Sequence, residues 1–198
     1  SEHFDWFVRG RVSLASKILD VGCGSGRLLL KLQREGFRSL LGADPFVDQG
    51  CKALAATAIW GTQQLHCFPD ARYDGVFSIW YGKGPGVDRT GDAFRHANQA
   101  GSAPHGGVIA IGGDDHGAKS STVAAQTDHI FIAVSMPILA PATVQDYLDL
   151  GLHGFAMSRF SGCWVGFKAV TDTLETAGIV DVSPERLSIV LPQDVPDR

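Results

Sequence analysis

The chain lacks three features that would assign it at once to a common class. Its four cysteines include no Cys-x-x-Cys pair, so their spacing gives no support to a zinc or iron–sulfur site. Its longest apolar stretch, about residues 130–142, is too short to cross a bilayer and contains two prolines. Basic residues are not in surplus, because 17 Lys and Arg stand against 21 Asp and Glu. These absences argue against a membrane or nucleic-acid partner.

Length and composition indicate a folded globular chain. The sequence has 198 residues, of which 44% are hydrophobic and 19% charged, values that exclude a disordered or fibrous protein. The first residues do not have the layout of a secretory signal peptide, and the cysteines suggest no disulfide framework. We therefore expect one domain in a reduced, cytoplasmic setting.

Short apolar runs alternate with segments of helical periodicity along the chain. The pattern predicts strands at 17–21, 39–43, 74–80, 107–112 and 163–170. It predicts helices at 27–35, at 53–65 with an interruption at Gly61, at 92–99, from 144 with Thr143 as its cap, and at 172–177. Residues 81–90 and 113–121 are predicted to be polar loops. This alternation predicts an α/β fold, a single three-layer α/β/α domain with a mainly parallel sheet.

The first glycine cluster follows a predicted strand and opens a predicted helix. Gly22, Gly24 and Gly26 let the backbone turn sharply, Asp20 precedes them, and Asp44 ends the next predicted strand. Residues 1–48 thereby resemble the motif I region of class I S-adenosylmethionine-dependent methyltransferases. The resemblance implies that Asp20 and the glycines line the methionine part of S-adenosylmethionine and that Asp44 binds its ribose.

Residues 53–195 resemble a different family through long strings of unusual composition. The strings are Leu-Ala-Ala-Thr-Ala at 54–58, Trp-Tyr-Gly-Lys-Gly-Pro-Gly-Val-Asp-Arg-Thr-Gly-Asp at 80–92, Gly-Asp-Asp-His-Gly-Ala-Lys-Ser-Ser at 113–121 and Ser-Arg-Phe-Ser-Gly-Cys-Trp-Val at 158–165. They are similar to the N-terminal, pyrimidine-binding-type domain of indolepyruvate ferredoxin oxidoreductase. That enzyme belongs to the thiamine-diphosphate-dependent 2-oxoacid:ferredoxin oxidoreductases. The resemblance implies oxidative decarboxylation of an arylpyruvate to an acyl-CoA, with ferredoxin as the electron acceptor.

Five charged residues follow predicted strands of this second segment and are our candidate cofactor or substrate contacts. Lys83, Asp88 and Arg89 come after the strand at 74–80, and Asp114 and Asp115 come after the strand at 107–112. Ligands of parallel α/β sheets bind at this edge, where a lysine and an arginine can hold a substrate carboxylate. For the two aspartates, a purely structural role in capping the following backbone is an equal alternative.

The second segment departs from its family at the residues that carry the chemistry. The family's glutamate, which polarises the aminopyrimidine, is replaced by Lys52, and a charged lysine has no lone pair with which to accept a proton. The Gly-Asp-Gly…Asn segment that holds diphosphate and Mg²⁺ is absent, as is a ferredoxin-like cysteine cluster. Thiamine diphosphate with Mg²⁺ would therefore need a partner domain or subunit, and no catalytic residue and no metal ligand is assigned.

We interpret the chain as a fragment or hybrid joined near residues 47–52 and incomplete for catalysis. Ferredoxin and a second copy of the chain are further expected partners. Two alternatives stay open at this point. One is a methyltransferase that uses S-adenosylmethionine, and the other is a non-catalytic scaffold or interaction domain.

Overall fold

The computed structural model describes residues 17–21, 33–34, 39–43 and 51–192. The chain divides into two compact units, residues 1–51 and 52–198, and each is described by itself. The join expected near residues 47–52 includes this boundary. A merged single domain stays a prediction.

In the first unit two strands form a parallel pair, as the sequence predicts. β1 (Lys17–Val21) and β2 (Ser39–Ala43) pair in register from Lys17 opposite Ser39 to Val21 opposite Ala43. Most of the helix predicted at 27–35 lies outside the described residues. The two residues of it that are described, 33–34, are helical.

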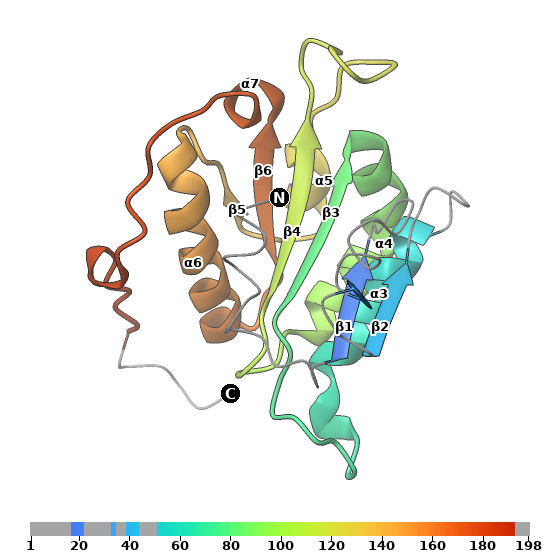
Figure 1. The fold of residues 1–198 in the computed structure, drawn as a ribbon. Helices are drawn as coiled ribbons and strands as arrows, with labels where there is room; N and C mark the ends of the chain where they lie inside the picture. The colour runs from blue at the N-terminus through green and yellow to red at the C-terminus, as the bar shows by residue number, and fades with distance from the viewer. Residues whose placement is uncertain (1–16, 22–32, 35–38, 44–50, 193–198) are drawn as a thin grey trace. The chain divides into compact units, whose positions relative to one another are not determined.

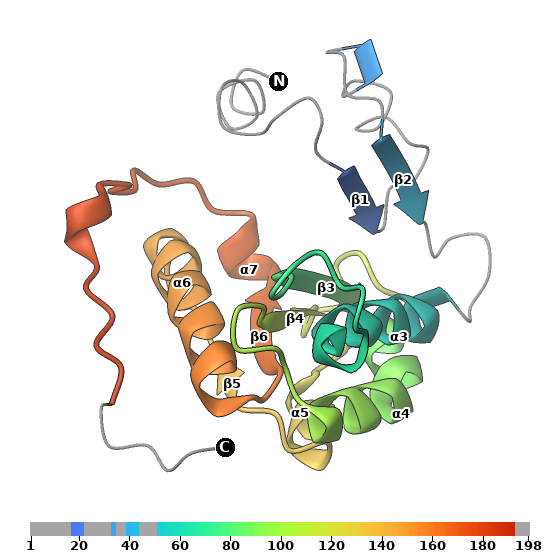
Figure 2. The ribbon, with the colours of Figure 1, turned by 90° about the horizontal axis from the view of Figure 1, so that it is seen from below.

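The second unit is a three-layer α/β/α arrangement around a parallel sheet. The sheet has the order β3-β4-β6-β5, formed by Ser78–Lys83, Val108–Asp114, Val165–Val170 and Ile138–Leu139, and every described pairing in it is parallel. α6 (Val144–Ser161) lies on one face, while α3 (Cys51–Gln63), α4 (Gly84–Ala100) and α5 (Asp128–Ala133) lie on the other (Figure 2). α7 (Thr171–Leu174) follows β6 directly, and Leu65–Cys67 and Pro184–Arg186 are short 3-10 helices. The predicted α/β class with a mainly parallel sheet is confirmed.

Aromatic side chains fill the space between the sheet and its helix-rich face. Trp80 from β3, Phe94 from α4, Phe131 from α5 and Trp164 are almost completely buried. The Phe94 ring lies edge-on to Trp80, with 4.7 Å between the ring centroids, and 6.1 Å from both Phe131 and Trp164. Edge-to-face aromatic packing of this kind fixes how the helices sit on the sheet.

Several sequence predictions are wrong in their boundaries, among them the strand at 74–80, which is β3 at Ser78–Lys83. Residues 81–90 are not a loop, because β3 continues to Lys83 and α4 begins at once at Gly84 with Pro85 in its first turn, where a fixed φ suits a helix. The helix at 53–65 is not interrupted, because α3 runs through Gly61 to Gln63. A glycine inside a helix costs about 1 kcal/mol, which packing of the remaining residues can offset.

The predicted cap of α6 is confirmed in detail. Thr143 Oγ1 accepts a hydrogen bond from the Asp146 amide at 3.2 Å. In return, the Asp146 carboxylate accepts from the amides of Ala142 and Thr143, each at 2.9 Å. The side chains of Thr143 and Asp146 thus each accept a hydrogen bond from the other residue's amide, which is the arrangement of a capping box. These backbone bonds lower the pKa of Asp146.

Candidate functional site

Three of the five predicted charged residues lie at one edge of the sheet, which we call the carboxyl edge. β3 ends at Lys83 and β4 ends at Asp114, and the register places Lys83 beside Gly113 and Asp114 beside Val170. Figure 1 shows these strand ends pointing the same way, with the segment after β4 rising beyond them. The parallel topology thus brings Lys83, Asp114 and Asp115 together from two separate strands.

Lys83 is bound to the segment that follows β4. Its Nζ donates to Ser120 O at 2.8 Å, Ser120 Oγ at 2.7 Å and Ser121 Oγ at 3.2 Å. An ammonium group has three N–H donors, and these three acceptors match that number. In this conformation, Lys83 therefore holds its own chain, and a ligand carboxylate would have to replace the serine acceptors.

Asp115 also holds the segment after β4, through hydrogen bonds to its backbone. Its buried carboxylate accepts from the amides of Lys119 and Ser120, each at 2.9 Å, and its backbone carbonyl accepts from the Ala125 amide at 3.2 Å. The Ser120 amide is the largest of several causes, Lys83 among them, that lower the pKa of Asp115 to about 2. Asp115 thus makes the backbone contacts expected of the structural alternative.

Asp114 belongs to a buried ionic network that sequence reasoning missed. Its Oδ1 accepts from the Thr127 amide at 2.9 Å, and its Oδ2 lies 3.3 Å from Lys168 Nζ. Lys168 also reaches Asp128 Oδ2 at 2.7 Å, and His116 Nε2 lies 3.8 Å from Asp114 Oδ2. A lysine near the end of the predicted strand at 163–170 was the one signal that pointed here.

The other predicted residues do not join this network. Asp88 and Arg89 are exposed on α4, and Arg89 Nη1 donates to Pro85 O within its own helix. Asp20 lies on β1 opposite Gly42. The remaining predicted contacts of S-adenosylmethionine, Gly22, Gly24, Gly26 and Asp44, lie outside the described residues.

Lys52, the residue predicted to replace the family's glutamate, also lies near the carboxyl edge. Its Nζ is 3.4 Å from Tyr81 O, one of the last residues of β3. The ammonium lies 6.0 Å from the ring centroid of Trp80 and 5.7 Å from that of Tyr81, and its stem is 3.3 Å from the position of a Cβ on Gly86. A cation over aromatic rings is favourable, so Lys52 fits its surroundings.

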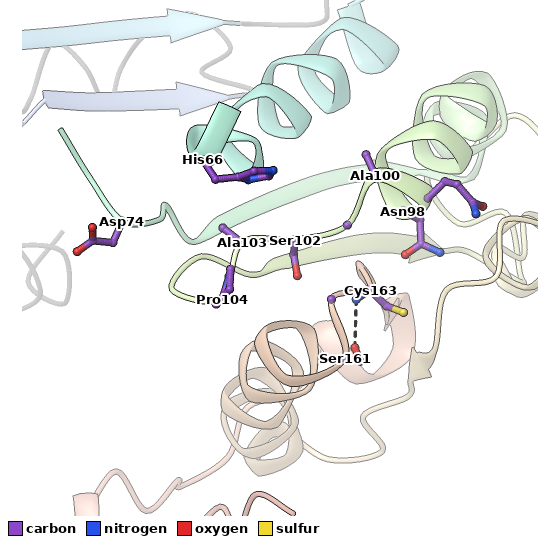
Figure 3. A pocket seen from close by; sticks show the side chains of 12 residues that line it. His66, Asp74, Asn98, Ala100, Ser102, Ala103, Pro104, Ser161 and Cys163 are labelled. Carbon is purple, nitrogen blue, oxygen red and sulfur yellow. Dashed lines mark hydrogen bonds between the residues drawn. The ribbon is translucent and has the colours of Figure 1, made fainter. Parts of the chain in front are cut away.

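A cavity of about 590 Å³ opens at the opposite end of the sheet, which we call the amino edge. Its wall combines the end of α4, the segment that leads into β4, the end of α6 and residues before β3 (Figure 3). The polar groups include His66, Asp74, Asn98, Ser102 and Cys163. Asn98 and Ser102 already bond to the chain, Asn98 to the Trp164 amide at 2.8 Å and Ser102 to Ser158 O at 2.7 Å.

Within the part of the chain that the structure describes, no group of three His, Cys, Asp or Glu side chains could hold a metal ion. The helices of that same part include none long and apolar enough to span a membrane. Comparison of the sequence with protein-family models and with curated proteins finds no significant match.

Proposed function

We propose that residues 53–195 are the pyrimidine-side half of a thiamine-diphosphate-dependent 2-oxoacid:ferredoxin oxidoreductase site, incomplete for catalysis in this chain. The substrate class is an arylpyruvate such as indolepyruvate. A partner domain or subunit supplies the Mg²⁺ and diphosphate site, and ferredoxin and a second copy of the chain are further partners. We place this assembly in the cytoplasm.

The observation that carries this proposal is the convergence of Lys83, Asp114 and Asp115 at the carboxyl edge. Parallel α/β sheets bind their ligands at this edge, beyond the strand ends. The residues come from two of the four strings, 80–92 and 113–121, that carry the resemblance to the indolepyruvate enzymes. Lys83 offers a cation for the carboxylate of a 2-oxoacid, provided that the ligand displaces the serines.

The residues present do not fit the thiamine chemistry itself. Lys52, the predicted replacement of the family's glutamate, lies beside Tyr81 O and two aromatic rings. A protonated lysine cannot accept a proton as that glutamate does. We therefore assign no step of the oxidative decarboxylation to this chain and propose a binding half-site only.

The test is an NMR titration of the full chain with indolepyruvate, which maps the residues whose amide signals shift. The proposal predicts saturable shifts at 83–86 and 114–121, and loss of these shifts in Lys83→Met. Arg95→Met is the matched control, because Arg95 is an exposed cation of α4 that bonds to Ala133 O at 2.9 Å. Shifts confined to the amino edge, or no shifts, would refute the proposal.

A second candidate, an S-adenosylmethionine-dependent methyltransferase, draws support from the first unit. β1 and β2 are parallel and in register, so their last residues, Val21 and Ala43, lie at the same edge of this pair. Glycines after one strand and an acidic residue after the next suit a nucleoside cofactor.

A further inference from the structure

The segment after β4 is tied to the carboxyl edge by a small set of polar contacts. We call residues 116–124 the edge loop. None of its side chains is buried, so burial of apolar surface contributes little to its position. Its base is closed by the bridge between Asp115 and Ala125. The contacts that bind it to other elements are ionic or hydrogen-bonding, and most are exposed.

Two lysines supply these outer contacts. Lys83 reaches Ser120 and Ser121 from β3, as described above. Lys119, within the edge loop, pairs with Asp172 on α7 and lies 3.7 Å from Glu175 Oε2. Exposed ion pairs such as those of Lys119 contribute little to stability, so releasing them costs little.

The edge loop has its own internal order. Asp115 binds the amides of Lys119 and Ser120 together, and the Ala118 amide donates to Asp115 O at 3.1 Å. Asp115 thus tethers the edge loop at its base, and residues 116–124 can swing about this base when the lysine contacts break.

The base of the loop packs against the start of α4 at a glycine. A Cβ on Gly84 would lie 2.5 Å from Cβ of Ala125, closer than any two such atoms can approach. The present position of the loop therefore requires glycine at 84. A methyl group on residue 84 would clash with Ala125 and push the base of the loop away from α4.

From these contacts we propose that the edge loop is a movable element latched by Lys83, and that its release frees the Lys83 ammonium to bind an oxyanion. The latch is inferred from the contacts of Lys83 and Lys119. The identity of the oxyanion, a 2-oxoacid carboxylate and not a phosphate, rests on the proposed function. Lys83 would exchange its serine acceptors for ligand oxygens, so the ammonium keeps its acceptors in both states.

Hydrogen–deuterium exchange of the full chain tests the latch without any ligand. In Ser120→Ala/Ser121→Ala and in Gly84→Ala, amides at 116–124 are expected to exchange about tenfold faster, because the open state becomes more populated. Gly91→Ala is the control in the same helix, since its Cβ would lie 3.8 Å from the nearest atom, Ile130 Cγ2, an ordinary contact. Exchange that is as slow in both test variants as in Gly91→Ala would overturn the latch.

Addition of pyruvate or inorganic phosphate to the wild-type chain tests the ligand. Faster exchange at 116–124 with either ion, absent in Lys83→Met, supports the oxyanion exchange, and a response to pyruvate alone identifies a carboxylate. A response to phosphate alone keeps the latch and counts against the proposed 2-oxoacid. Variants that loosen the loop while neither ion changes exchange overturn the oxyanion step and leave the movable loop standing.

Discussion

The ammonium of Lys168 lies 3.3 Å from Oδ2 of Asp114, at the ends of two neighbouring strands. The Asp114 side chain is fully buried and that of Lys168 is 14% exposed. Lys168 also binds Asp128, so one cation serves two carboxylates. Burial disfavours the charge on Lys168, but its two acid partners outweigh this and raise its pKa.

Replacing Lys168 with methionine is expected to lower the free energy of unfolding by about 3 kcal/mol, because it leaves a buried carboxylate without its counter-charge. Urea unfolding followed by tryptophan fluorescence measures the loss. Lys168→Arg keeps the charge and should lose less. A loss below about 1 kcal/mol in Lys168→Met would contradict a stabilising ion pair between Lys168 and Asp114.

Asp115→Asn is expected to destabilise the chain in a pH-dependent way. The folded-state pKa of Asp115 is about 2, below the ordinary 3.8, so its stabilisation is complete above pH 3.8 and is lost as pH falls toward 2. The difference in unfolding free energy between wild type and variant should be constant from pH 7 to pH 5. It should shrink from pH 4 to pH 2. A difference that does not change over this whole range would contradict the assignment.

Thr143→Ala removes the cap of α6 and should cost about 1 kcal/mol of stability. Thr143→Ser keeps the hydroxyl and should cost less. Because Thr143 and Asp146 cap the same turn, the losses of Thr143→Ala and Asp146→Ala should not add in the double variant. Thermal unfolding of the four proteins measures this coupling, and strict additivity would contradict a capping box.

Two glycines should respond to alanine in opposite directions. A Cβ on Gly166 would lie 2.9 Å from Cγ of the buried Phe131, so Gly166→Ala should destabilise by about 1–3 kcal/mol. A Cβ on Gly151, within α6, meets no atom within 4 Å, so Gly151→Ala should stabilise by about 0.5–1 kcal/mol. Chemical denaturation of both variants measures the two changes, and equal effects would contradict the packing described.

The sequence predicts those features of this fold that depend on local pattern. The cap of α6 at Thr143 and the strands beside the glycine runs are examples. The parallel arrangement of consecutive strands is also enough to place Lys83 and Asp114 at one edge of the sheet. The start of α4 was missed because Gly84 and Gly86 look like loop residues. In the structure, Gly84 instead allows the close approach of Ala125, and Gly86 that of Lys52. These contacts are visible only in the tertiary structure.

The sequence did not predict the ionic network or the cavity, because both are built from residues far apart along the chain. Lys168 and Asp128 lie 40 positions apart, and the strand pattern alone does not say which face of β6 carries a buried charge. The cavity is built from segments around residues 66–74, 98–104 and 161–163, which come together only when the sheet forms.

The central claim, a half-site for a thiamine enzyme at the carboxyl edge, is tested most directly by calorimetric titration. Wild type and Lys52→Glu would each be titrated with thiamine diphosphate plus Mg²⁺, and separately with S-adenosylhomocysteine. The account predicts that wild type binds thiamine diphosphate weakly, through its pyrimidine side alone, that Lys52→Glu binds it more tightly, and that S-adenosylhomocysteine gives no heat. Binding of S-adenosylhomocysteine, with no response of either protein to thiamine diphosphate, would contradict the account and assign the function to the first unit.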